Sequence, residues 1–136
     1  MGLDISPGGA QWSYSGFMEF RRGLAAEEGL VLGEMEGFCQ HYPGDENAHP
    51  GAPCPVARRP WSEADTPLEP LLSHSDCDGV LLPYQCEQML PRLREIHYSW
   101  LVHVDYPVMD YDVRQLGALI DGMAHCVQNG CAVVFR

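Results

Sequence analysis

The C-terminal stretch "DYDVRQLGALIDGMAHCVQNGCAVVFR" (110–136) combines the two kinds of segment that decide the fold class. Apolar residues recur at helical spacing through its first part, which predicts a helix from Asp110 to Gln128. The buried stripe of this helix is expected to consist of Val113, Leu116, Leu119, Ile120, Met123 and Val127. The dipeptide "NG" (129–130) ends the helix, and the apolar run "CAVVFR" (131–136) predicts a terminal strand.

A strand and a helix are also expected at the N-terminal end. The stretch "GLDIS" (2–6) alternates in polarity and precedes Pro-Gly-Gly, a pattern that predicts a first strand. Either Ser13 or Ser15 is suited to be the N-cap of a helix that ends at Gly29. The apolar face of this helix is expected to include Phe17, Phe20 and Leu24.

A further helix is expected from Pro83, because proline is favoured in the first turn of a helix. Pro91 lies inside the pattern and removes one backbone hydrogen bond, so we expect a kink or a break there. Helical spacing relates Cys86, Met89, Leu90, Leu93, Ile96, His97 and Trp100. We therefore predict an α+β fold, in which a small sheet with strands 2–6 and 131–135 side by side packs against about three helices. The chain, residues 1–136, is expected to form a single domain.

The charge of the chain is unevenly distributed. Residues 33–67 are rich in Gly, Pro and acids and have no period, which predicts a long irregular loop or inserted lobe. Of the net charge of −11, eleven acids and two arginines between Glu27 and Asp78 contribute −9. This excess argues against nucleic-acid binding and predicts either plain solubility or a basic protein partner. The candidate partner-binding acids are Glu34, Glu36, Asp45, Glu46, Glu63 and Asp65.

Features of the whole chain bear on its compartment. No apolar run approaches the roughly 18 residues that a membrane-spanning helix needs. The N-terminal residues lack the basic and apolar regions of a secretory signal. The six cysteines are therefore predicted to be reduced thiols of a cytoplasmic protein that does not interact with membranes.

The stretch "LLSHSDCDGVLLPYQCE" (71–87) contains the candidate ligand or metal site, which consists of His74, Asp76, Cys77, Asp78 and Cys86. Two carboxylates followed by glycine resemble part of a calcium loop, but the other ligands of such a loop are missing, which leaves a looser divalent-cation site. Zinc would use the histidine and both cysteines of this site, with a fourth ligand from Cys39, His41, His49 or Cys54. Alternatively, Cys77 is a nucleophile with His74 as its base. No cofactor is firmly expected, because paired C-x2-C spacings are absent from the sequence.

A purely structural interpretation of the same stretch is a turn before a helix. Asp76 and Asp78 precede the helix whose expected N-cap, Leu82, has no polar side chain. Their carboxylates could accept the free N–H groups of the helix and complement its dipole. Gly79 supplies a left-handed position, and the two cysteines would then be small buried groups. This hypothesis predicts that replacing Asp78 by alanine costs about 0.5–2 kcal/mol, the usual loss for a cap.

Several of these stretches together resemble a family of small, uncharacterised bacterial and phage proteins. They are the opening "MGLDIS", "YSGFMEFRR" (14–22), "HPG" (49–51), "LLSHSDCDG" (71–79) with the cysteine that follows, and the closing "VVFR". That family typically begins MGLDISH and carries a central HSDCDG, whereas this chain has Pro7 where the histidine stands and Leu82 where a capping serine is usual. The HSDCDG stretch is also similar, more loosely, to an immunity-protein family of polymorphic toxin systems. These resemblances imply an intracellular setting and bring no established activity.

Two functions are expected from these observations. The first is a small acidic protein-binding module, of the immunity or counter-defence kind, that neutralises a basic partner. The alternative is a metal- or small-ligand-binding protein, with hydrolytic activity as one form, that uses the HSDCDG loop. Of the two, the non-enzymatic function is favoured by the concentrated negative charge.

Overall fold

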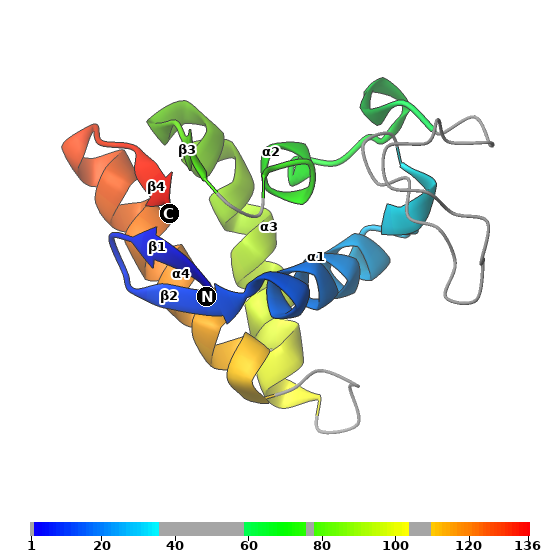
Figure 1. Cartoon of the computed structure of the whole chain (residues 1–136), viewed down its shortest axis with the longest axis horizontal. Coiled ribbons are helices and arrows are strands. Elements are labelled where there is room, and N and C mark those ends of the chain that lie inside the picture. Colours follow the sequence, from blue (N-terminus) through cyan, green and yellow to red (C-terminus); the bar gives the residue numbers. More distant parts are fainter. Residues whose placement is uncertain (1, 36–58, 76–77, 104–109) are drawn as a thin grey trace.

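A four-stranded antiparallel sheet and four α-helices make up the described part of the chain, which is residues 2–35, 59–75, 78–103 and 110–136 of the computed structural model (Figure 1). The strands are β1 (Gly2–Ser6), β2 (Ala10–Ser13), β3 (Gly79–Leu81) and β4 (Val133–Phe135). The helices are α1 (Tyr14–Glu27), α2 (Glu69–Leu72), α3 (Pro83–Val102) and α4 (Asp110–Asn129), with 3-10 turns η1 (Leu32–Glu34) and η2 (Trp61–Glu63). The predicted α+β class is confirmed.

The sheet brings the two ends of the chain together in its centre. Its strand order is β2-β1-β4-β3, and Ile5 of β1 lies opposite Phe135 of β4. Asp4 and Arg136 extend this pairing by exchanging two backbone hydrogen bonds of 2.9 Å. The predicted pairing of the terminal strands is therefore confirmed, whereas the strands β2 and β3 at the two edges were not expected.

Helix α1 begins and ends as its sequence predicts. The side chain of Ser13 accepts a hydrogen bond of 3.0 Å from the backbone N–H of Gly16, which identifies Ser13 as the N-cap. At the other end, Gly29 has a φ of 72° and the N–H of Leu30 donates to the carbonyl of Ala25, which is the Schellman arrangement. The buried residues of α1 are Phe17, Phe20, Arg21, Leu24 and Ala25.

Helices α3 and α4 pack along each other and support the sheet (Figure 1). Helix α3 runs without a break through Pro91, so of the predicted kink or break, the break is wrong and the kink stays a prediction. Pro91 faces solvent, where water can bind the carbonyl that the ring leaves without a partner. The turn between β1 and β2 rests directly on α4, since a Cβ placed on Gly8 would lie 2.4 Å from the carbonyl oxygen of Ala118.

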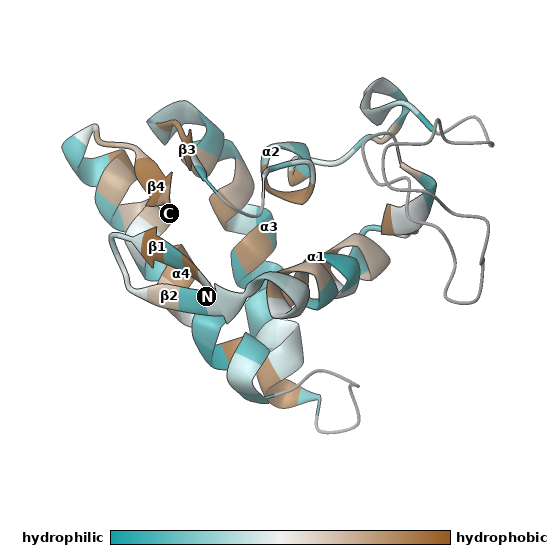
Figure 2. Ribbon diagram, viewed as in Figure 1, coloured by the Kyte–Doolittle hydropathy of each residue, from teal (hydrophilic) through white to brown (hydrophobic). Residues whose placement is uncertain are grey.

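The core lies between the sheet, α1 and the long helices. Trp12 of β2 stacks on Phe20 of α1 with ring centroids 4.4 Å apart, and Phe17 meets Phe135 of β4 edge to face at 6.0 Å. Figure 2 shows hydrophobic residues on β1, β3 and β4, whereas the long helices carry both hydrophobic and hydrophilic residues along their length. Of the predicted stripe on α4, the four central residues are buried and the outer two, Val113 and Val127, are half-buried.

The region predicted as an irregular loop, residues 33–67, has an ordered base. Residues 36–58 lie outside the described residues. On either side of them, η1 and η2 lie at the end of α1 that is remote from the sheet (Figure 1). Met35 and Arg59 form a parallel bridge, and the buried residues here are Leu32, Met35, Trp61, Ala64 and Leu68. In the part of the chain that the structure describes, no helix is apolar over a length that could cross a membrane.

Candidate functional site

The loop between α2 and β3 holds the histidine of the predicted site. The imidazole of His74 packs against the ring of Phe135 in β4, with ring centroids 4.1 Å apart. Its Nδ1 lies 2.8 Å from the carbonyl oxygen of Ser75, and its Nε2 lies 3.1 Å from the carbonyl oxygen of Val80 in β3. His74 therefore links the loop to the edge strand of the sheet.

These contacts decide what the His74 side chain can do in this conformation. A carbonyl oxygen only accepts, so each ring nitrogen forms its hydrogen bond only when it carries a proton. A neutral imidazole carries a single proton, so it forms one of these two hydrogen bonds while its other nitrogen keeps a lone pair. The observed geometry thus suits His74 to organising the backbone of the loop.

Asp78 is exposed and belongs to a local turn. Its carboxylate accepts a hydrogen bond of 3.3 Å from the hydroxyl of Ser75, and its backbone N–H donates to the same hydroxyl at 3.5 Å. Gly79 has a φ of 117°, and a Cβ there would lie 2.9 Å from Cε1 of His74. The predicted need for glycine at this position is therefore confirmed.

The prediction that Asp78 caps α3 is wrong. Strand β3 separates this residue from the helix, and the N-cap Leu82 has no polar side chain. The backbone N–H of Leu82 instead donates to Oε1 of Gln85 at 2.9 Å, which is one half of a capping box. A glutamine in the first turn of the helix, rather than the preceding carboxylate, therefore makes the side-chain contact at this end of α3.

Cys86 lies in the hydrophobic core at the start of α3. Its side chain is fully buried, and burial together with the neighbouring Cys131 raises the pKa of its thiol to about 11. At neutral pH the group is a protonated thiol, which is a poor metal ligand and a poor nucleophile. The expectation that Cys86 is a small buried group is confirmed.

The described members of the predicted metal site are not gathered around a common point. Among the residues that the structure describes, no group of three or more His, Cys, Asp or Glu side chains could hold a metal ion. Asp76 and Cys77 lie outside the described residues, as do the proposed fourth ligands Cys39, His41, His49 and Cys54. A zinc or other divalent-cation site that uses them stays a prediction.

Arg21 is a site residue that the sequence analysis missed. It is 2 % exposed, and its guanidinium lies 4.6 Å from the centre of the Phe17 ring. One nitrogen donates to the carbonyl oxygen of Leu72 at 3.4 Å and to that of His74. Helix α1 thereby fixes the point at which α2 ends and the loop begins. The sequence does contain a signal for the burial of Arg21, because this residue lies four positions after Phe17 and three before Leu24, on the apolar face of α1.

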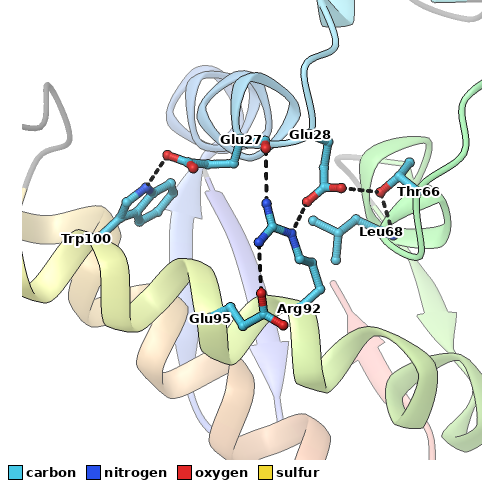
Figure 3. Close-up of polar contacts among 7 residues, drawn as sticks. All are labelled: Glu27, Glu28, Thr66, Leu68, Arg92, Glu95 and Trp100. Carbon is cyan, nitrogen blue, oxygen red and sulfur yellow. Dashed lines mark hydrogen bonds and ion pairs between the residues drawn. The ribbon is translucent and has the colours of Figure 1, made fainter.

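A second polar cluster joins α1 to α3 (Figure 3). The guanidinium of Arg92 forms an ion pair with Glu28, donates to the carbonyl oxygen of Glu27 at 3.1 Å and reaches Glu95 at 3.1 Å. The Glu28 side chain is 11 % exposed and that of Arg92 is 31 % exposed, so this pair is largely shielded from water. The bond to Glu28 and the charge of that carboxylate raise the pKa of Arg92.

The same cluster ties the region around η2 to the helices. The second carboxylate oxygen of Glu28 accepts a hydrogen bond of 3.2 Å from the hydroxyl of Thr66, which in turn accepts the backbone N–H of Leu68 at 3.1 Å. Glu27 accepts the indole N–H of Trp100 at 3.0 Å (Figure 3). Consequently, both glutamates at the end of α1 are used internally rather than offered to a partner.

Three of the predicted partner-binding acids are described, and all three are exposed: Glu34, Glu63 and Asp65. The carboxylate of Glu63 lies 3.9 Å from the guanidinium of Arg59, a solvent-exposed contact of the kind that contributes little. Within the described ranges, no cation pairs with Glu34 or Asp65. The other three acids, Glu36, Asp45 and Glu46, lie outside the described residues.

No family model matches this chain, and neither the curated proteins nor the solved structures include a significant match. Its function is therefore inferred from its own contacts and charges.

Proposed function

We propose that this chain is a small protein-binding module whose acidic lobe, residues 27–78, engages a basic protein partner. The observation that supports this function most is the charge of the lobe, which holds −9 of the net −11. Complementary potentials accelerate the encounter of two proteins and select against partners of the wrong sign. The chain is proposed to act by binding rather than by catalysis.

Three of the described carboxylates of the lobe are available for such a contact. Glu34, Glu63 and Asp65 are exposed, and among the described residues only Glu63 of these three forms an ion pair. An acid that is already neutralised inside the protein would add little attraction for a partner. These three would keep most of their charge for an incoming basic surface.

The base of the lobe is held in place, which would lower the cost of binding. The described residues beside the exposed acids include buried Met35, Trp61 and Leu68. The bonds from Thr66 to Glu28 and from Glu28 to Arg92 attach this base to α1 and α3 (Figure 3). A surface that is ordered before binding loses less conformational entropy when the complex forms.

An immunity or counter-defence role is proposed within this class. It is supported by the looser resemblance of the "HSDCDG" stretch (74–79) to an immunity-protein family of polymorphic toxin systems. In such a role the acidic lobe would cover the basic surface of a toxin or defence protein. Binding alone would be sufficient to neutralise that partner.

A comparison of two charge-neutralised variants tests the proposal. One variant removes three charges from the lobe by Glu34→Gln, Glu63→Gln and Asp65→Asn. The control removes three exposed charges elsewhere by Asp4→Asn, Glu87→Gln and Asp121→Asn. Each protein is immobilised and used to capture proteins from a lysate at low ionic strength, followed by elution with increasing salt.

The expected result is a basic protein that the wild type and the control retain to the same salt concentration. The lobe variant should release the basic protein at a clearly lower salt concentration, because it has fewer negative charges and less salt is then needed to screen the remaining attraction. Equal retention by all three proteins, or a retained protein that is indifferent to salt, would contradict the electrostatic proposal.

The alternative function, metal or small-ligand binding at the HSDCDG loop, has less support. The described contacts of His74 go to main-chain carbonyl groups, and Cys86 is a core residue. Metal analysis of protein purified without a histidine tag, after incubation with zinc, manganese and calcium, tests this alternative. One metal per chain would favour it over the binding module.

A further inference from the structure

Two cysteines meet where α4 ends and the chain turns into β4. The sulfur of Cys131 lies 2.9 Å from the sulfur of Cys126. A disulfide requires about 2 Å between the same atoms, so the pair is about 1 Å from bonding distance. Both are free thiols in the structure.

Backbone geometry produces this contact. Gly130 has a φ of 65°, and the backbone N–H of Cys131 donates to the carbonyl oxygen of Cys126 at 3.1 Å. This is the Schellman arrangement at a helix end, in which the side chains of the residues at these two positions commonly touch. In most helices that contact is between apolar residues, whereas here both positions are cysteine.

The two thiols differ in their access to solvent. Cys131 is partly exposed, whereas Cys126 is fully buried. Burial raises the pKa of Cys126 to about 12, with further contributions from the neighbouring Cys131 and Cys86. A small reagent in solution therefore reaches Cys131 first, and Cys126 is the natural second partner.

We propose that Cys126 and Cys131 are a reversible oxidation site, which forms an intrachain disulfide with a low-molecular-weight disulfide such as oxidised glutathione. The Cys131 thiolate attacks the reagent disulfide, which forms a mixed disulfide and releases one reagent thiolate. The raised pKa of Cys126 makes it a slow nucleophile, but its sulfur is held beside that of Cys131. The reagent thiolate released in the first step takes the proton of Cys126, and the Cys126 sulfur then attacks the Cys131 sulfur and releases the second reagent thiolate. Two protein thiols are oxidised to one disulfide, and the reagent is reduced to two thiols.

This bond would act on the centre of the sheet. It would join the last turn of α4 to the residue that stands two positions before β4, and β4 lies between β1 and β3. Phe135 of β4 also packs on His74 in the loop. Oxidation is thus expected to hold β4, and the loop that packs on it, more firmly, and a reducing thiol is expected to reverse the effect.

The positions of the arginines allow this disulfide to be detected directly by peptide mass spectrometry. Cleavage after arginine releases residues 115–136 as one peptide, in which Cys126 and Cys131 are the only cysteines. The folded, reduced full-length chain is incubated with oxidised glutathione, quenched in acid, alkylated and digested. Mass spectrometry should show this peptide without alkylation and lighter by two hydrogens than its reduced form.

Matched variants separate the two steps of the reaction. In Cys126→Ser, the same peptide should carry one glutathione on Cys131, because the thiol in direct contact with it has been removed. In Cys131→Ser, Cys126 should stay unmodified while the protein is folded. The control Cys86→Ala should still form the bond, since Cys86 has no direct sulfur contact like that of the pair.

The proposal is overturned if the 115–136 peptide of the wild type stays fully alkylated under these conditions. It is equally overturned if the peptide is found cross-linked to a peptide that contains another cysteine. A circular dichroism spectrum of each variant verifies that it is folded, and the wild-type measurement requires no variant at all.

Discussion

Replacing Arg92 with methionine tests the polar cluster that attaches Thr66 and Leu68 to helices α1 and α3. Methionine keeps a long apolar side chain and helix propensity but removes the guanidinium. The change deletes the ion pair with Glu28 and the hydrogen bond to the carbonyl oxygen of Glu27 (Figure 3). It leaves the Glu28 carboxylate, 11 % exposed, with the Thr66 hydroxyl as its one donor among the described residues.

The size of the effect follows from the burial of the pair. Breaking a fully buried ion pair costs about 3–5 kcal/mol, whereas an exposed pair contributes about 0–1 kcal/mol. With Arg92 31 % exposed and Glu28 11 % exposed, this pair lies between these limits. We expect the free energy of unfolding to fall by about 2 kcal/mol, which corresponds to roughly 8 °C in Tm for a chain of this length.

Urea denaturation of Arg92→Met and of the control Arg94→Met makes the comparison. Arg94 lies on the same helix and is exposed, so the control should change stability by less than about 0.5 kcal/mol. Hydrogen exchange at the amide of Leu68, which is bonded to Thr66, should accelerate in Arg92→Met alone. Equal stability of the two variants would show that the cluster does not hold the lobe, and the reasoning would be wrong.

Three further changes probe other parts of the fold. Gly8→Ala should lower the free energy of unfolding, measured by a thermal melt, by about 3 kcal/mol, because Gly8 has a φ of 102° and the added Cβ would meet the carbonyl oxygen of Ala118. The control Gly9→Ala should lower it by only about 1 kcal/mol, since nothing lies within 4 Å of the added atom. Asp78→Ala should change stability by less than about 0.5 kcal/mol, and a larger loss on urea denaturation would restore its role as a cap. Because the pKa of Cys86 is raised to about 11, its buried thiol stabilises the fold below pH 9, and this contribution is lost as the pH rises from 9 to 11. The urea midpoint should fall over that range, and it should fall less in Cys86→Ala.

Local sequence was sufficient to predict the long helices and the terminal strands. The helical spacing of Leu116, Leu119 and Met123 and the serine and glycine at the ends of α1 are signals within a few residues of one another. Helix ends are stabilised by their own neighbours, as Ser13 and Gly29 show. The uneven charge, too, is a property of composition and needs no fold to be seen.

The candidate site depended on contacts between residues far apart in the chain. Arg21 reaches His74 across 53 positions, and Arg92 reaches Glu28 across 64 positions. The edge strands β2 and β3 are only four and three residues long, so they exist through pairing with β1 and β4 rather than through any periodicity of their own. The sequence by itself determined where helices form and where charge accumulates, because those properties are local. Only the tertiary structure decided that Arg21 binds the carbonyl groups of Leu72 and His74 and that Arg92 pairs with Glu28, because the partner of a polar group depends on which segments pack beside it.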